Sequence, residues 1–118
     1  MFDVDETTLS NVKQIDALFK LSSDPGGTQD ASTVKAVTDT FDDPAIQPSL
    51  QLYRFARKNK VTVFFVTGRD EIDRRGTAKN LKAVGYTQWQ HLYLRSAQQA
   101  HLPAEVYKVA IRKAITAQ

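Results

Sequence analysis

A nearly continuous apolar run, from Val61 to Val66, is the feature that most constrains the fold of this chain. It is rich in β-branched and aromatic residues, and it lacks the alternation of a strand with one face in water. Such a run is typical of a parallel strand that helices cover on both faces. Thr62 interrupts the run, which is far shorter than the roughly 20 residues that cross a bilayer, so no membrane span is expected.

Strand and helix patterns alternate along the rest of the chain. Besides the apolar run, the first residues and the segment 91–95 are expected to form strands. Helices are expected over the segments 12–19, 31–41, 48–58, 70–84 and from Pro103 onward. This order predicts an α/β fold with a parallel sheet and right-handed crossovers.

The helical segments carry apolar residues at the spacing of a buried face. The residues expected to face the core or a pocket are Val12, Ile15, Leu18, Phe19, Leu52, Tyr53, Phe55, Ala56, Ile72, Leu81, Val84, Val106, Val109 and Ala110. Gly85 is expected to end the helix 70–84 in a left-handed conformation. Trp89 is expected to pack against the sheet or the preceding helix, because a lone Trp belongs to the core more often than to a binding platform.

Length and composition indicate one folded domain spanning residues 1–118. The chain has 118 residues, and 42% of them are hydrophobic, which is enough for a single core. It has no cysteine, which excludes disulfides, thiolate metal ligands and a thiolate nucleophile. No basic region followed by an apolar stretch occurs at the N-terminus, so no secretory signal is expected within this sequence.

The net charge of +3 conceals an asymmetry. Residues 1–73 carry 8 basic and 12 acidic side chains, and residues 74–118 carry 8 basic and 1 acidic. The basic residues of the second part are dispersed among helical positions, without an arginine-rich run or interleaved aromatic residues. Nucleic acid is therefore not an expected partner.

Two aspartates one residue apart, Asp3 and Asp5, open the sequence. At the end of a strand they would point to the same side, where one carboxylate could attack an electrophile and the other could handle a proton. The alternative is a turn or a helix N-cap. A calcium loop is excluded, because Thr8 and Gln14 stand where that loop requires Gly and Glu.

The carboxyl ends of parallel strands meet at one edge of the sheet, where α/β proteins place their active sites. Asp3 and Thr67 both lie at such ends, so two polar segments far apart in the sequence are expected to converge. His91 and His101 do not lie at such ends. We expect both histidines to be ordinary surface or strand residues.

A set of motifs resembles the haloacid dehalogenase superfamily, and within it the class B-type acid phosphatases, a group that includes plant acid phosphatases and vegetative storage proteins. The motifs are Phe-Asp-Val-Asp-Glu-Thr-Thr-Leu-Ser-Asn, Phe-Phe-Val-Thr-Gly-Arg, Asn80-Leu81 with Gly85-Tyr86 and Trp89, Leu92-Tyr93-Leu94-Arg95, and Tyr107-Lys108. The resemblance covers nearly the whole chain. It implies a three-layer, Rossmann-like core with a parallel sheet, in which residues 12–45 form a small helical cap insert.

The resemblance also implies a reaction, the hydrolysis of small phosphomonoesters. Asp3 is implied as the nucleophile and Asp5 as the acid that protonates the leaving oxygen and later activates water. Thr67, Gly68 and Lys108 are implied to hold phosphoryl oxygens. In the family, Mg²⁺ is held by the nucleophile's carboxylate, by the backbone carbonyl of the second aspartate and by an acid from a later motif.

That later acidic motif is absent from this sequence, in which no Asp follows Asp73. A non-catalytic storage or phosphate-ester-binding protein is therefore the alternative to a Mg²⁺-dependent acid phosphatase. The resemblance places the last strands of the sheet outside residues 1–118, which predicts an open edge at the first strand. Such an edge favours self-association.

Overall fold

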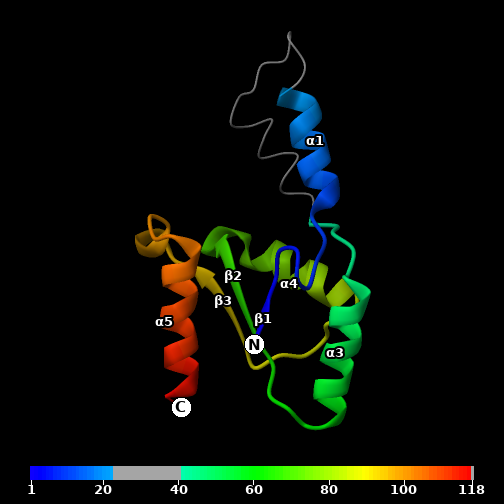
Figure 1. Ribbon diagram of the computed structural model, residues 1–118, viewed down its shortest axis with the longest axis vertical. Helices are drawn as coiled ribbons and strands as arrows, with labels where there is room; N and C mark the ends of the chain where they lie inside the picture. Colours follow the sequence, from blue (N-terminus) through cyan, green and yellow to red (C-terminus); the bar gives the residue numbers. More distant parts are fainter. Residues whose placement is uncertain (23–40, 118) are drawn as a thin grey trace.

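The computed structural model describes residues 1–22 and 41–117 of the chain. Three parallel strands, β1 (Phe2–Asp3), β2 (Phe64–Asp70) and β3 (His91–Arg95), form a sheet in the order β1-β2-β3 (Figure 1). The predicted α/β fold with a parallel sheet is therefore confirmed.

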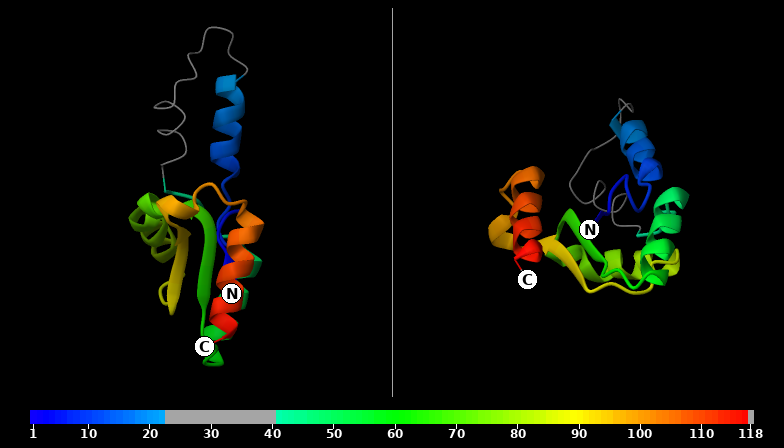
Figure 2. Two further views of the ribbon diagram at one scale, coloured as in Figure 1. Left: turned by 90° about the vertical axis from the view of Figure 1, so that its left-hand side faces the viewer. Right: turned by 60° about the horizontal axis from the view of Figure 1, so that its bottom comes forward.

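In the part of the chain that the structure describes, four α-helices surround or extend from this sheet. They are α1 (Val12–Ser22), α3 (Gln47–Lys58), α4 (Arg74–Ala83) and α5 (Ala104–Thr116), with short 3-10 helices η1 (Glu71–Asp73) and η2 (Ala97–Gln99). Figure 2 shows α4 and α5 on opposite sides of the sheet, which gives the expected layers of helix, sheet and helix. Within the described residues, no helix combines the length and the apolar character needed to span a bilayer.

The core lies on one face of the sheet and is centred on Phe65. The ring of Phe65 meets the rings of Tyr53, Tyr86 and Trp89 at centroid distances of 6.5, 5.7 and 5.6 Å. Trp89 therefore packs against the sheet, as its sequence context predicts. Aromatic groups at these distances add to the stability that their buried area supplies.

The register of the sheet places polar residues at its carboxyl edge. Asp3 of β1 lies opposite Val66 of β2, directly before Thr67. Among the described residues β1 pairs with β2 alone, so β1 is an edge strand. This agrees with the open edge expected at the first strand.

Helix α1 departs most from the expectation of a buried apolar stripe. It begins near the carboxyl edge of the sheet and extends away from the body of the molecule (Figure 1). Val12, Ile15 and Phe19 are exposed, so the prediction that they face a core or pocket is wrong. The side chain of Leu18 and most of the expected helix 31–41 lie outside the described residues.

Other helices bury fewer apolar residues than their periodicity suggests. The expected core residues that are exposed are Leu52, Phe55, Ile72, Val106, Val109 and Ala110. The sheet contacts a narrower stripe, which buries Leu50 and Tyr53 of α3 and Tyr107 of α5. Ile72 is exposed because β2 continues to Asp70 and η1 follows it, which delays the helix to Arg74.

The end of α4 follows its prediction. Leu81 is fully buried, Val84 is partly buried against the core, and Gly85 adopts φ 115°. A residue with a Cβ is strained at that angle, so glycine ends this helix for a conformational reason.

Candidate active site

The loop after β1 is a tight turn that orients both aspartates. The carbonyl of Val4 accepts hydrogen bonds from the backbone N–H groups of Thr8 and Leu9, at 3.0 and 2.9 Å. Glu6 adopts a left-handed φ of 54° inside this turn, and the hydroxyl of Thr8 donates to the carbonyl of Asp3 at 2.5 Å. The turn and the chemical interpretation of the motif are therefore compatible, since the turn fixes where the carboxylates point.

Asp3 is paired with Lys108, which lies 105 residues later in the chain. The ammonium Nζ of Lys108 donates to Oδ2 of Asp3 at 2.7 Å, and the backbone N–H of Val4 donates to Oδ1 at 2.8 Å. Both side chains are part-exposed, so the pair lies at a surface that a ligand can reach. Helix α5, which packs along β2, carries Lys108 to this position.

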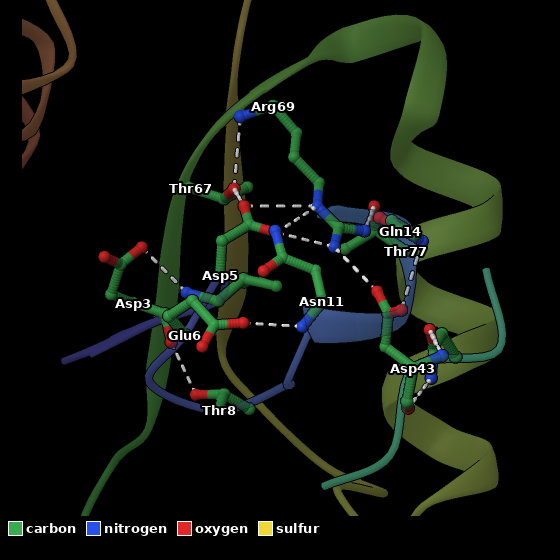
Figure 3. A network of polar contacts seen from close by, with 12 residues as sticks. Asp3, Asp5, Glu6, Thr8, Asn11, Gln14, Asp43, Thr67, Arg69 and Thr77 are labelled. Carbon is green, nitrogen blue, oxygen red and sulfur yellow. Dashed lines mark hydrogen bonds and ion pairs between the residues drawn. The ribbon is translucent and has the colours of Figure 1, made fainter. Parts of the chain in front are cut away.

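Asp5 is held by β2. Thr67 is fully buried, and its hydroxyl donates to Oδ2 of Asp5 at 3.3 Å and accepts from the backbone N–H of Arg69 at 3.1 Å (Figure 3). The predicted convergence of the ends of the first and second strands is thus confirmed. Thr67 also orients the residue that follows Gly68.

Arg69 is a site residue to which the sequence analysis assigns no role. Its Nε donates to both oxygens of Asp5, at 3.1 and 3.3 Å, and its Nη2 donates to Oδ1 at 2.7 Å. Burial alone would lower the pKa of Arg69, but the hydrogen bonds and charges of Asp5 and Asp43 raise it overall. The guanidinium therefore stays charged and faces a carboxylate in bidentate geometry.

Asp43 is a second residue that the sequence analysis does not identify. Its side chain is only 1% exposed, and its Oδ2 accepts from Nη2 of Arg69 at 3.3 Å. Burial raises the pKa of Asp43, although the Arg69 charge acts in the opposite direction. The sequence offers one signal for it, an acidic pair directly before Pro44, which also fits an ordinary turn.

Gly68 is placed beside the site but without a polar role in the structure. A Cβ on Gly68 would lie 3.5 Å from the Cβ of Ala104 at the start of α5, which is an ordinary contact. His91 and His101 are exposed, as expected, and the ring of His91 lies 4.3 Å from that of Tyr93.

A hollow of about 510 Å³ lies at the opposite, amino end of the sheet. Its lining consists of Arg57, Thr62, Lys82, Thr87, Gln88, Trp89 and Gln90. None of the predicted site residues belongs to it.

The oxygen atoms at Asp3 and Asp5 are chemically suited to a hard cation. Mg²⁺ binds through one or two carboxylates and keeps several water or phosphate ligands, so the Asp3 carboxylate and the Asp5 carbonyl fit it. In residues 1–22 and 41–117, however, no three His, Cys, Asp or Glu side chains gather closely enough to hold a metal.

The sequence matches a known protein family over its whole length. Residues 1–118 match the family described as the HAD superfamily, subfamily IIIB (acid phosphatase). The chain belongs to this family. The resemblance to this superfamily that the motifs indicate is therefore confirmed.

One curated relative and one solved structure are similar to this chain over most of its length. Acid phosphatase 1 of Solanum lycopersicum is 34% identical over 127 residues, an alignment that covers 98% of this chain and 44% of the relative. The class C acid phosphatase of Bacillus anthracis, solved with tungstate bound, has the same fold with a TM-score of 0.72 at 18% identity, over 94% of this chain and 45% of that one. This HAD subfamily IIIB chain thus spans less than half the length of these relatives.

Proposed function

We propose that the protein hydrolyses small phosphate monoesters through a covalent aspartyl-phosphate on Asp3. The observation that carries this proposal is the pairing of Asp3 with Lys108 at the carboxyl edge of the sheet, two residues before Asp5. This pairing supports the proposal, because the Asp3 carboxylate lies beside a cation that can neutralise phosphoryl oxygens. Membership of an acid phosphatase family supports the same reaction.

In the first step a carboxylate oxygen of Asp3 bonds to phosphorus, and the bond from phosphorus to the ester oxygen breaks. The ester oxygen keeps the electron pair and takes a proton from the carboxyl group of Asp5, so that a neutral alcohol leaves. Lys108, the Thr67 hydroxyl and the Gly68 backbone N–H are the donors we assign to the phosphoryl oxygens. Lys108 gives up its contact with Asp3 as the phosphoryl group enters.

In the second step a water molecule loses a proton to the Asp5 carboxylate, and its oxygen bonds to phosphorus. The bond from phosphorus to Asp3 breaks and inorganic phosphate is released. Asp5 is thereby returned to its protonated form and Asp3 to its carboxylate. Each proton and each bond is accounted for by these two side chains and one water.

Magnesium is the cofactor that this site would take, through the Asp3 carboxylate and the backbone carbonyl of Asp5. When bound, it would neutralise charge on the phosphoryl group. We expect the 118 residues alone to bind Mg²⁺ weakly, because the acid of the later motif is absent from this sequence. Losing even a residue that only supports a metal ligand lowers metal affinity by about 10- to 100-fold. Calorimetry tests this, and micromolar affinity would reveal a ligand outside the Asp3 and Asp5 pair.

The open edge of β1 favours association of the chain with another copy of itself. Unpaired backbone groups on an edge strand invite a further strand, and Met1 is exposed beside it. We expect a concentration-dependent increase in mass by sedimentation equilibrium. A protein that stays monomeric at all concentrations would contradict this.

Trapping of the phosphorylated enzyme tests the reaction itself. Rapid denaturation during turnover, followed by mass spectrometry, should find one phosphoryl group on the peptide that contains Asp3. Aluminium or beryllium fluoride should form an adduct at the same carboxylate. An adduct on another residue would refute the assignment of Asp3, and binding of phosphate esters without turnover would favour the non-catalytic alternative.

A further inference from the structure

We propose that Asp43 is a positioning residue that holds Arg69 against Asp5 and thereby fixes the orientation of the proton-donating carboxyl group. This inference rests on the proposed function, in which Asp5 protonates the leaving oxygen. It assigns a role to a buried carboxylate that no step of the reaction uses.

The guanidinium group of Arg69 forms hydrogen bonds to three different side chains (Figure 3). Nε and Nη2 face Asp5, Nη2 also donates to Asp43 at 3.3 Å, and Nη1 donates to the hydroxyl of Thr77 at 3.1 Å. The guanidinium is planar and has partners in three directions, so it cannot rotate without breaking a charge-assisted hydrogen bond. Asp5 therefore meets a fixed cation.

Asp43 is itself anchored through both of its backbone groups. Its backbone N–H donates to Oδ1 of Asn80 and its carbonyl accepts from Nδ2 of the same side chain, both at 2.8 Å. Asn80 is buried on α4 and so ties the loop to a helix that packs on the sheet. A carboxylate with both its backbone groups and its side chain bonded is suited to positioning another group.

Gly76 allows the loop to approach α4 this closely. A Cβ at Gly76 would lie 2.5 Å from the ring of Phe41, which precedes Asp43 by two residues. Contacts under 3.0 Å force the ring to move. A glycine inside a helix is less favourable than alanine, and here it leaves room for the Phe41 ring.

The same carboxylate joins both ends of the segment 12–45, the expected cap insert, to the site. Oδ1 of Asp43 accepts from Nε2 of Gln14 at 3.0 Å, and Gln14 lies in the first turn of α1. Oδ2 faces Arg69. Asp43 thus connects the base of the insert with Asp5 through a single guanidinium.

The test compares substrates whose leaving groups differ in their need for a proton. Asp43→Asn keeps the shape of the side chain and removes the charge that faces Arg69. The readout is kcat/KM, which reports the steps up to the phosphorylation of Asp3 and excludes the later water step, in which Asp5 serves both substrates alike. We expect roughly a 10- to 100-fold fall in kcat/KM for an alkyl phosphate such as glycerol phosphate, a part of the roughly 10²- to 10⁴-fold that general acid catalysis supplies. The kcat/KM for 4-nitrophenyl phosphate, whose leaving group needs no proton, should fall less than about threefold.

Asp42→Asn is the matched control, because it removes the same charge from an exposed neighbour. It should leave both rates unchanged. Equal losses on the two substrates in Asp43→Asn, or no loss on either, would overturn the proposal. If Asp43→Asn does not fold, Thr77→Val removes another partner of Arg69 with the shape retained and should show the same difference between substrates.

A measurement without substrate separates this inference from the proposed reaction. In the wild type, the Nε–H proton of Arg69, which donates to Asp5, should exchange slowly with water by NMR. It should exchange at least about tenfold faster in Asp43→Asn, because a guanidinium whose Nη2 has lost its charge-assisted bond to Asp43 separates from Asp5 more often. Unchanged exchange would overturn the positioning role. If the wild type hydrolyses no phosphate ester, the proposed reaction fails, and the exchange result still decides what Asp43 does.

Discussion

The loop after β1 and helix α1 follow each other in the chain, yet they differ in how the rest of the molecule holds them. In the loop, Asp3 meets Lys108 and Asp5 meets Arg69, partners that lie 105 and 64 residues away. Along α1, by contrast, the apolar residues Val12 and Ile15 are exposed. The difference shows that a polar motif at a strand end can mark where residues far apart in the sequence converge, whereas an amphipathic pattern does not identify what covers the helix.

The largest expected difference between the two regions concerns activity. Asp3→Asn should abolish turnover, because an amide is not a competent nucleophile. Asp16→Asn on α1 removes a charge from an exposed side chain that pairs with Lys20, and it should leave turnover unchanged. Initial rates with 4-nitrophenyl phosphate measure both. A fully active Asp3→Asn enzyme would show that the nucleophile lies elsewhere.

A pair of valine substitutions tests the same contrast through stability. Val63, directly before β2, is 1% exposed, and Val12 is 58% exposed on α1. Val63→Ala should lower the free energy of unfolding by about 2 to 3 kcal/mol, from lost burial and the cavity left behind. Val12→Ala should change it by less than about 0.5 kcal/mol. Urea unfolding of both variants checks this, and equal losses would mean that α1 packs on the body.

The contrast also explains which parts of the site can be predicted from the sequence. Asp3, Thr67 and Lys108 follow from strand ends and from motifs whose order along the chain is specific. Arg69 and Asp43 do not, because their roles depend on contacts between the loop before α3 and the end of β2. Neither spacing nor periodicity encodes such a contact between segments 26 residues apart.

In the fold, too, the features set by local sequence are predictable, and those set by tertiary contacts are not. The strand 91–95 and the stop at Gly85 depend on local patterns and backbone conformation, and both are confirmed. The predicted start of α4, residue 70, is four residues too early. The strand β2 continues through Thr67 and Gly68 to Asp70, whereas turn-forming residues at these positions suggest that the strand ends before them. Pairing of Asp70 with Arg95 across the sheet extends the strand, and that pairing is a tertiary contact.

The smallest expected effect concerns how firmly the loop after β1 is attached to the core. Tyr86 is fully buried, and its hydroxyl donates to the carbonyl of Thr8 at 3.2 Å. Tyr86→Phe should lower the free energy of unfolding by about 1 kcal/mol at neutral pH. Tyr107→Phe is the matched control, because the buried hydroxyl of Tyr107 has no hydrogen-bond partner among the described residues, and its removal should cost less.

Alkaline pH sharpens this last comparison, because burial raises the pKa of Tyr86 from its ordinary value of 10.0 to about 12. The folded pKa lies above the unfolded one, so the contribution of Tyr86 to stability is complete below pH 10 and is lost as the pH rises through about 12. Phenylalanine at this position cannot ionise. The stability deficit of Tyr86→Phe should therefore shrink over this range, as measured by urea unfolding at each pH. A deficit that stays constant would mean that the hydroxyl of Tyr86 is solvated, and that the loop carrying Thr8 is held by its backbone bonds to the segment 44–46 instead.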